Sequence, residues 1–401
     1  MQSPVPVAHP PGRRSDLLLA AALLLIAFNL RPAIAAVGPL APVIREAMGL
    51  SHSLLGLLTT LPLLAFGTVS MLAPVLTRRY GLQGTVTGAL VLLVLGVAVR
   101  SVPAVSALFT GTFLFGAGIA LGNVLLPALV KQGFSKKFGL MTGLYSGMMG
   151  VGAALAAGIS VPLAGSLPWA WRGALAIWAA PALLALVLWA LQPASADRRL
   201  AEPSASTGAR SLSGSRLAWN VALFMGLQSF AFYVVLAWLP AMLQHRGMAP
   251  EAAGWMLSLS QASGIAGSLL VPLWAGKRQD QRGIMRWLVG LEAVAILGLL
   301  FPGGGPEPLW VSLIGLVLGG SFGLALYLIV VRAPDTRTAT RLSGMAQAIG
   351  YLVAATGPLL AGALFDLAGR WQPVFVLLLA VAALKLYTGL GAARPRMVPA
   401  A

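Results

Sequence analysis

A single arginine stands deep inside the first long apolar segment of the chain, in the tetrapeptide Asn29-Leu30-Arg31-Pro32. The segment begins near residue 17, so Arg31 lies about 20 Å along it at a rise of about 1.5 Å per helical residue. Charge inside hydrocarbon is costly and therefore marks a functional candidate. A guanidinium is a rigid fork of donors that suits an anion or a strongly polar group. We predict that Arg31 binds such a solute; the alternative is that it extends to the nearer membrane interface.

Two further ionisable residues fall inside apolar segments. Glu292 could titrate as a proton carrier or pair with a Lys or Arg at the cytoplasmic rim, and we favour the pairing. Lys385 is expected to extend its ammonium group to the membrane surface. Asp366 and Glu251 lie at segment ends, where helix capping is a sufficient explanation.

Several uncharged polar residues lie at membrane depth and are candidates for a substrate site together with Arg31. Each is also a candidate for a hydrogen bond between helices, which is the commoner use of such residues. Gln347 and Tyr351 are four residues apart and share one helical face. The candidates are Asn29, Asn123, Tyr145, Gln228, Tyr233, Gln261, Gln347 and Tyr351.

The composition argues against enzyme chemistry. The chain has no cysteine, which excludes disulfides, thiolate nucleophiles and cysteine-ligated metals. Its three histidines are scattered, and no carboxylate cluster or nucleotide-binding loop is visible outside the apolar segments. We therefore expect neither a catalytic site nor a cofactor nor a metal.

Hydropathy indicates a membrane protein, because 58% of the 401 residues are hydrophobic and only 9% are charged. A bilayer core needs about 20 apolar residues in a helix. Twelve segments meet that length: 17–39, 54–76, 84–102, 105–130, 139–163, 172–191, 217–242, 252–275, 284–301, 309–331, 342–365 and 372–392.

A polar stretch divides these segments into two groups of six. We predict a cytoplasmic tail (1–16), a six-helix bundle (17–191), a cytoplasmic linker (192–216), a second six-helix bundle (217–392) and a cytoplasmic tail (393–401). The fold class is therefore an all-α membrane protein with twelve transmembrane helices.

The formal net charge of +17 is compatible with nucleic-acid binding or with basic cytoplasmic loops. If the N-terminus is cytoplasmic, 21 of the 27 Lys and Arg fall in alternate, cytoplasmic segments. Five fall on the other side, namely Arg45, Arg100, Arg172, Arg246 and Arg370. This distribution follows the positive-inside rule. It predicts a multi-pass inner-membrane protein with both termini cytoplasmic, and it removes nucleic acid as a partner.

The two halves repeat a pattern. Gly56 precedes Pro74 by 18 residues, and Gly254 precedes Pro272 by the same interval, each proline being followed by a basic pair. Two six-helix halves related by a repeat are the plan of major facilitator transporters. Lines of glycine are expected to let helices approach closely: Gly111, Gly116, Gly118 and Gly122 in the fourth segment, and Gly143, Gly147, Gly150 and Gly152 in the fifth.

The same segments resemble the cyanate and nitroimidazole transporter (CynX/NimT-like) family of the major facilitator superfamily. The motifs that carry the resemblance are Asn29 to Pro32, Val37 to Pro39, Leu57 to Pro62, Leu125 to Lys131, Met141 to Tyr145, Gln228 to Phe230, Trp238 to Pro240, Leu342 to Gln347, and Gly350 to Pro358. The resemblance implies secondary active transport of a small polar or anionic solute by alternating access, with Arg31 recognising the anion. It also implies a monomer whose partners are the solute, protons and the lipid bilayer.

The sequence departs from the general facilitator pattern in two places. The loop Leu76 to Gly81 lacks the usual acidic residue. The fifth segment also lacks the Gly-Pro motif that many drug antiporters have, since 147–158 contains no proline, and this weakens the exporter interpretation. An exporter of toxic compounds remains the second interpretation, with Phe28, Phe230, Phe232 and Trp255 as its apolar surface. A membrane sensor that binds without transport is the third.

Overall fold

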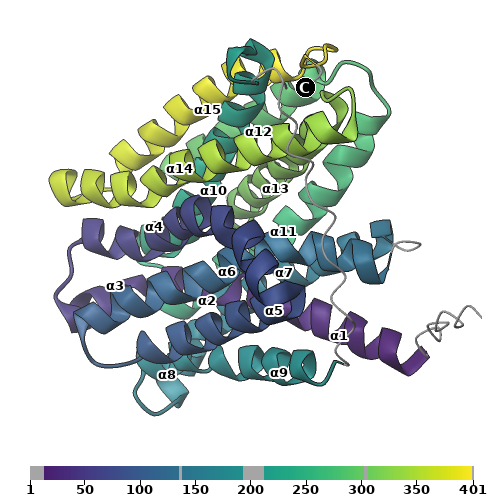
Figure 1. The fold of residues 1–401 in the computed structure, drawn as a ribbon. Coiled ribbons are helices and arrows are strands. Elements are labelled where there is room, and N and C mark those ends of the chain that lie inside the picture. Colours follow the sequence, from purple (N-terminus) through teal and green to yellow (C-terminus); the bar gives the residue numbers. More distant parts are fainter. Residues whose placement is uncertain (1–12, 135–137, 193–211, 302–305, 400–401) are drawn as a thin grey trace, which may run out of the picture.

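The computed structural model describes residues 13–134, 138–192, 212–301 and 306–399, and it is helical throughout these ranges. Figure 1 shows two lobes, with the first half of the chain in one and the second half in the other. The first lobe contains α1 (Arg13–Asn29), α2 (Pro32–Ala35), α3 (Val37–Met48), α4 (His52–Thr68), α5 (Ala73–Val99), α6 (Val105–Gly133), α7 (Phe138–Ser166), α8 (Trp171–Ala176) and α9 (Ala179–Ala190). The second contains α10 (Arg216–Gln244), α11 (Pro250–Gly276), α12 (Arg282–Leu300), α13 (Glu307–Val331), α14 (Thr336–Ala368) and α15 (Gln372–Ala392).

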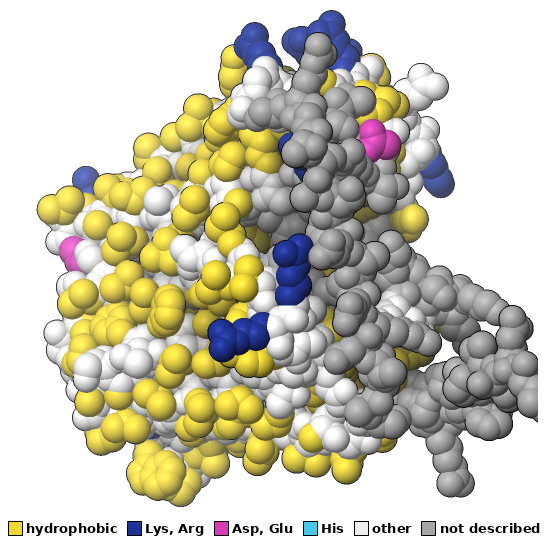
Figure 2. Space-filling view, viewed as in Figure 1, with side chains coloured by type: hydrophobic (Ala, Val, Ile, Leu, Met, Phe, Trp, Pro, Cys, Tyr) yellow, Lys and Arg dark blue, Asp and Glu magenta, His cyan; other side chains and the backbone are white. Residues whose placement is uncertain are grey.

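Twelve spans in the described ranges are long and apolar enough to cross a membrane, which confirms the predicted number. Hydrophobic side chains are spread over the coloured part of the face seen in Figure 2, as expected of a surface that contacts lipid. Most of the expected N-terminal tail and of the expected linker lies outside the described residues. The C-terminus lies at one end of the bundle, which is called the termini end below. The opposite end, where α4 begins and α14 ends, is called the distal end.

The first span is interrupted beside its arginine. α1 ends at Asn29 and α2 begins at Pro32, which leaves Arg31 with φ −124° and ψ −37° at the junction. Proline lacks an N–H and disfavours a helical conformation in the residue before it, so Pro32 explains the break. Gly152 of α7 packs against the backbone of Phe28 next to the break. The span therefore places a charged side chain on an irregular backbone segment at membrane depth.

Arg100 supports this break, a role that was not predicted. It was counted among the basic residues on the non-cytoplasmic side, and its side chain is fully buried. Nη1 donates to the carbonyl of Ala33 at 2.6 Å and Nη2 to that of Leu175 at 3.4 Å. The guanidinium also lies 4.8 Å from the centre of the Phe115 ring. Arg100 thus connects the irregular first span to the sixth, which is itself divided into α8 and α9.

The loop between α11 and α12 holds an acidic residue, unlike the corresponding loop after the second span. Asp280 forms an ion pair with Arg282 at 2.6 Å. Hydrogen bonds from the Arg282 side chain and backbone hold the pKa of Asp280 down to about 2. Asp280 is therefore ionised at any physiological pH.

The lobes pack directly against one another in the distal half of the molecule. Thr60 of α4 donates to the carbonyl of Ala355 in α14 at 2.8 Å. A side-chain carbon at Gly56 would lie 2.5 Å from the carbonyl oxygen of Pro358, and one at Gly38 would lie 2.5 Å from that of Leu236. Only glycine permits these backbone approaches, because separations below 3.0 Å require the neighbour to move.

The fifth span, α7, is packed less closely towards the termini end. Among the described residues, a side-chain carbon at Gly143 or Gly147 would meet nothing within 4 Å, so the expectation of close helix packing is wrong at these two positions. It is confirmed at Gly152, against Phe28, and at Gly150, which faces Ile265 of the other lobe. The glycines of the fourth span all pack closely, as expected. The lobes are thus in contact distally and leave α7 uncovered nearer the termini end.

These contacts predict that Gly56→Ala opens the distal end. The added methyl group collides with backbone and costs about 1–3 kcal/mol in the packed state. Because the chain has no cysteine, a cysteine at Thr60 is a unique reporter of opening. In a Thr60→Cys background, we expect maleimide to label the Gly56→Ala variant about fivefold faster or more.

Gly147→Ala is the matched control, since its methyl group enters open space. Equal labelling rates in the two alanine variants would show that the α4–α14 approach does not control access.

Candidate functional site

Arg31 lies at the interface of the two lobes. Its Nη1 donates to the hydroxyl of Tyr233 in α10 at 3.2 Å. The guanidinium carbon lies 5.8 Å from the centre of the neighbouring Phe232 ring. No carboxylate pairs with Arg31 in the described residues. Its charge therefore faces a neutral phenol and an aromatic ring, which leaves most of its N–H donors available to a ligand.

Tyr351 of α14 joins the same group from a third helix. It lies close enough to Arg31 and Tyr233 to interact with both electrostatically. Its ring packs edge-on against Phe66 of α4, with centroids 5.3 Å apart. These residues, Arg31, Phe66, Phe232, Tyr233 and Tyr351, are called the central cluster below. Phe66 was not predicted, because a phenylalanine in an apolar helix gives no signal of its own.

Two other predicted residues lie on the helices of the central cluster. Gln347, one turn from Tyr351 on α14, donates to the Ser343 hydroxyl at 2.9 Å. Gln228 of α10 is buried, and its amide nitrogen donates to the hydroxyl of Ser229 at 2.6 Å. Gln347 and Gln228 thus each donate to a hydroxyl of their own helix, and their part in a substrate site stays a prediction.

The remaining predicted residues are not joined to Arg31 by any hydrogen bond in the described part of the chain. Asn29 is buried and donates to the carbonyls of Leu25 at 2.8 Å and Pro181 at 3.0 Å, which ties α1 to α9. Asn123 on α6 and Tyr145 on α7 are half-buried, and Gln261 on α11 is buried. The structure thus brings Arg31, Tyr233 and Tyr351 together, and a role of these four in the site stays a prediction.

Glu292 and Lys385 form an ion pair inside the second lobe. Both side chains are completely buried, and the Ser321 hydroxyl lies 3.5 Å from the ammonium group. The expectation that Lys385 extends to the membrane surface is therefore wrong. An ammonium group this far from water needs a partner, because an uncompensated buried charge is strongly destabilising. The second oxygen of Glu292, Oε1, has no hydrogen-bond partner.

A carboxylate closes the distal end between the lobes. Asp366 of α14 accepts hydrogen bonds from the backbone nitrogens of His52 at 3.0 Å and Ser53 at 2.8 Å. The Ser53 hydroxyl and the Nδ1 atom of His52 also contact it, at 2.5 and 2.8 Å. Asp366 was predicted to cap a helix, and it does so across the lobe interface, at the N-terminus of α4.

No group of three or more His, Asp or Glu that could hold a metal ion occurs among the described residues.

The sequence matches the family model described as Major Facilitator Superfamily over residues 17–355. The chain belongs to the major facilitator superfamily. It is therefore a transporter and a multi-pass membrane protein of the inner membrane.

Three relatives match along almost the whole chain. The uncharacterized transporter YycB of Bacillus subtilis is 42% identical over 394 residues, covering 97% of both chains. The 2-nitroimidazole transporter of Escherichia coli is 40% identical over 373 residues, covering 93% of this chain and 94% of its own. The cyanate transport protein CynX of Escherichia coli is 30% identical over 356 residues, covering 87% and 90%. The resemblance to the cyanate and nitroimidazole family is confirmed.

Solved structures share the facilitator fold at low sequence identity. A bacterial homologue of the human lysosomal transporter Spinster, in an inward-facing and occupied conformation, has a TM-score of 0.79 at 15% identity and covers 98% of this chain and 100% of its own. A D-xylose–proton symporter has a TM-score of 0.74 at 17% identity and covers 95% and 98%.

The buried ion pair predicts a strong asymmetry between single and double variants. Lys385→Met leaves the Glu292 carboxylate buried without a partner, which costs about 3–5 kcal/mol. The double variant Glu292→Leu with Lys385→Met replaces both charges by apolar groups and is expected to unfold near the wild-type temperature. Thermal unfolding of the purified protein in detergent, followed by tryptophan fluorescence, measures both. A single variant as stable as wild type would contradict a buried, charged pair.

Proposed function

We propose that this transporter moves a small polar or anionic solute, cyanate-like or nitroimidazole-like, across the inner membrane by alternating access, and that Arg31 binds the solute in the central cluster. The observation that carries the proposal is the unpaired guanidinium of Arg31 at the lobe interface. The activities named for the 2-nitroimidazole and cyanate relatives support it.

The chemistry of the central cluster suits such solutes. Arg31 supplies positive charge and spare donors to an oxyanion or a nitro group, and the low dielectric strengthens that interaction. The aromatic rings of Phe66, Phe232 and Tyr351 supply flat apolar surface to a small ring. Tyr233, which belongs to the second lobe, accepts a hydrogen bond from the Arg31 guanidinium. The position of the guanidinium that would bind the solute therefore depends on both lobes.

The proposed transport cycle follows from the two ends of the molecule. In the present state the lobes are packed distally and α7 is uncovered towards the termini end. The excess of Lys and Arg in termini-side loops supports a cytoplasmic position for that end. On this assignment the structure is an inward-facing state, and solute leaves the central cluster towards the cytoplasm when the distal end is closed.

Energetics favour coupling to protons if the solute is an anion. Uptake of one negative charge against an inside-negative potential costs about 2.3 kcal/mol per 100 mV, which a proton carried with it cancels. Glu292 is a weak candidate for the proton carrier, because it would have to separate from Lys385 to take up a proton.

Export of toxic compounds is the second candidate function. The aromatic residues Phe66, Phe232 and Tyr351 favour it, because rings beside the arginine accommodate hydrophobic organic molecules as readily as a nitroimidazole. Resistance to such compounds on overexpression, lost in Arg31→Gln, would support export over uptake.

The proposal predicts that uptake depends on Arg31. Proteoliposomes containing the wild type are expected to take up labelled 2-nitroimidazole or labelled cyanate saturably. In Arg31→Gln we expect uptake to fall at least about tenfold, since a hydrogen bond to a charged group contributes about 1.5–3 kcal/mol. Arg370→Gln, a distal and exposed arginine, is the control. Saturable uptake that is equal in both variants would make Arg31 structural, and no uptake of either solute would exclude both.

Proton coupling is tested by imposing an inward proton gradient on the same vesicles. If Glu292 carries the proton, the variant Glu292→Leu with Lys385→Met takes up solute at a rate that no longer responds to the gradient. A preserved response in this variant, with the wild type also responding, removes Glu292 from the coupling mechanism.

A further inference from the structure

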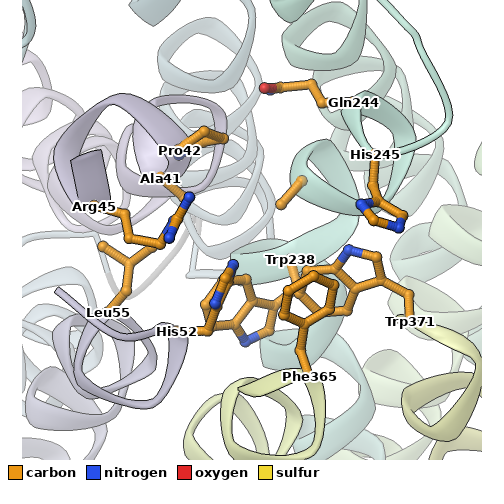
Figure 3. A pocket seen from close by; sticks show the side chains of 11 residues that line it. Ala41, Pro42, Arg45, His52, Leu55, Trp238, Gln244, His245, Phe365 and Trp371 are labelled. Carbon is orange, nitrogen blue, oxygen red and sulfur yellow. The ribbon is translucent and has the colours of Figure 1, made fainter. Parts of the chain in front are cut away.

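A cavity lined by polar and aromatic side chains lies at the distal end, away from the central cluster. Its volume is about 220 Å³. Both lobes contribute to its walls: Arg45 of α3 and His52 of α4 come from the first, and Gln244, His245 and Trp371 come from the second. Figure 3 shows Arg45 and His245 on opposite sides of the cavity. It is called the distal cavity below.

The polar lining of the distal cavity favours an anion. Arg45 brings a permanent positive charge, and the imidazoles of His52 and His245 add donors. Among the described residues, no Asp or Glu lines the cavity. The neighbouring carboxylate of Asp366 is engaged by His52 and Ser53 at the start of α4.

The apolar lining of the distal cavity favours a flat ring. The rings of His52 and Phe365 have centroids 4.2 Å apart, and those of Phe365 and Trp371 lie 4.4 Å apart. Trp238 completes the group at 5.3 Å from Trp371. Figure 3 shows these rings gathered on one side of the cavity. An apolar cavity of about 150 Å³ accepts benzene, so this one has room for a single ring with a small charged substituent.

The distal cavity is separated from Arg31 by packed backbone. The α3 and α10 helices, which line the cavity, meet below it where Gly38 lies against the carbonyls of Leu236 and Ala237. A ligand in the distal cavity is therefore on the far side of the closure from the central cluster.

We propose that the distal cavity is a regulatory site for an aromatic monocarboxylate, bound with its carboxylate between Arg45 and His245 and its ring against Phe365 and Trp371. Because both lobes form the walls, the site exists only while the distal end is closed. A ligand with affinity for one state alone shifts the population towards that state. Occupancy therefore holds the distal end shut and inhibits transport without competing for Arg31. The inhibition rests on the proposed alternating access, whereas the binding does not.

Binding is tested with benzoate and purified full-length protein by isothermal titration calorimetry. We expect Arg45→Gln to weaken benzoate binding about tenfold or more, and Arg370→Gln to leave it unchanged. Benzamide, which lacks the charge, and cyclohexanecarboxylate, which lacks the aromatic ring, should bind more weakly than benzoate. Absence of benzoate binding, or binding lost in Arg31→Gln but kept in Arg45→Gln, would overturn the site.

Regulation is tested by maleimide labelling of Thr60→Cys, whose side chain lies in the lobe interface. Saturating benzoate should slow the labelling severalfold, and it should have no effect when Arg45→Gln is also present. Benzoate that binds through Arg45 but leaves the labelling rate unchanged would overturn the regulatory role while leaving the transport proposal intact. Failure of solute uptake in the wild type would instead count against the proposed function, and the calorimetric result would still decide whether the site exists.

Discussion

A guanidinium without a carboxylate partner at the lobe interface is the constraint on which this structure depends. Low dielectric makes such a charge unfavourable unless its donors are satisfied. The protein meets that demand with a phenol from the opposite lobe and an aromatic ring, not with a counter-ion. It also holds the arginine on a helix break that Pro32 creates and that Arg100 supports through the carbonyl of Ala33. In the described part of the chain, a full negative charge is therefore what the surroundings of Arg31 lack, and a solute can supply it.

The two ends of the molecule differ in how closely the lobes pack. Distally, backbone meets backbone at Gly38 and Gly56, and one carboxylate, Asp366, caps the first turn of a helix in the other lobe. These contacts depend on shape and short-range hydrogen bonds, so a small separation of the lobes removes them together. Towards the termini end, Gly143 and Gly147 of α7 face open space. Closure at that end would need a rigid-body movement of the two lobes relative to one another.

The sequence was sufficient for the spans and for the position of Arg31, because hydropathy and charge are local properties. Tyr233 and Tyr351 were candidates for the same reason, as polar groups at membrane depth. The sequence could not show which candidates meet, since that depends on how α1, α10 and α14 cross. Arg100 lies at the end of an apolar run and was counted on the outer side; in the structure Gly111 of the next helix packs against its backbone. The pairing of Lys385 with Glu292 was equally inaccessible, because the residues are 93 positions apart.

That separation has a consequence for biogenesis. The ribosome delivers α12 to the membrane before α15 has been synthesised, so the carboxyl group of Glu292 enters the bilayer without its ammonium partner. Until the last helix inserts, the second lobe carries an ionisable group without its partner at membrane depth, which is costly. Completion of the chain removes this defect in a single docking event. A nascent or truncated chain is thereby chemically distinguishable from a finished one, which gives membrane quality control a feature to recognise.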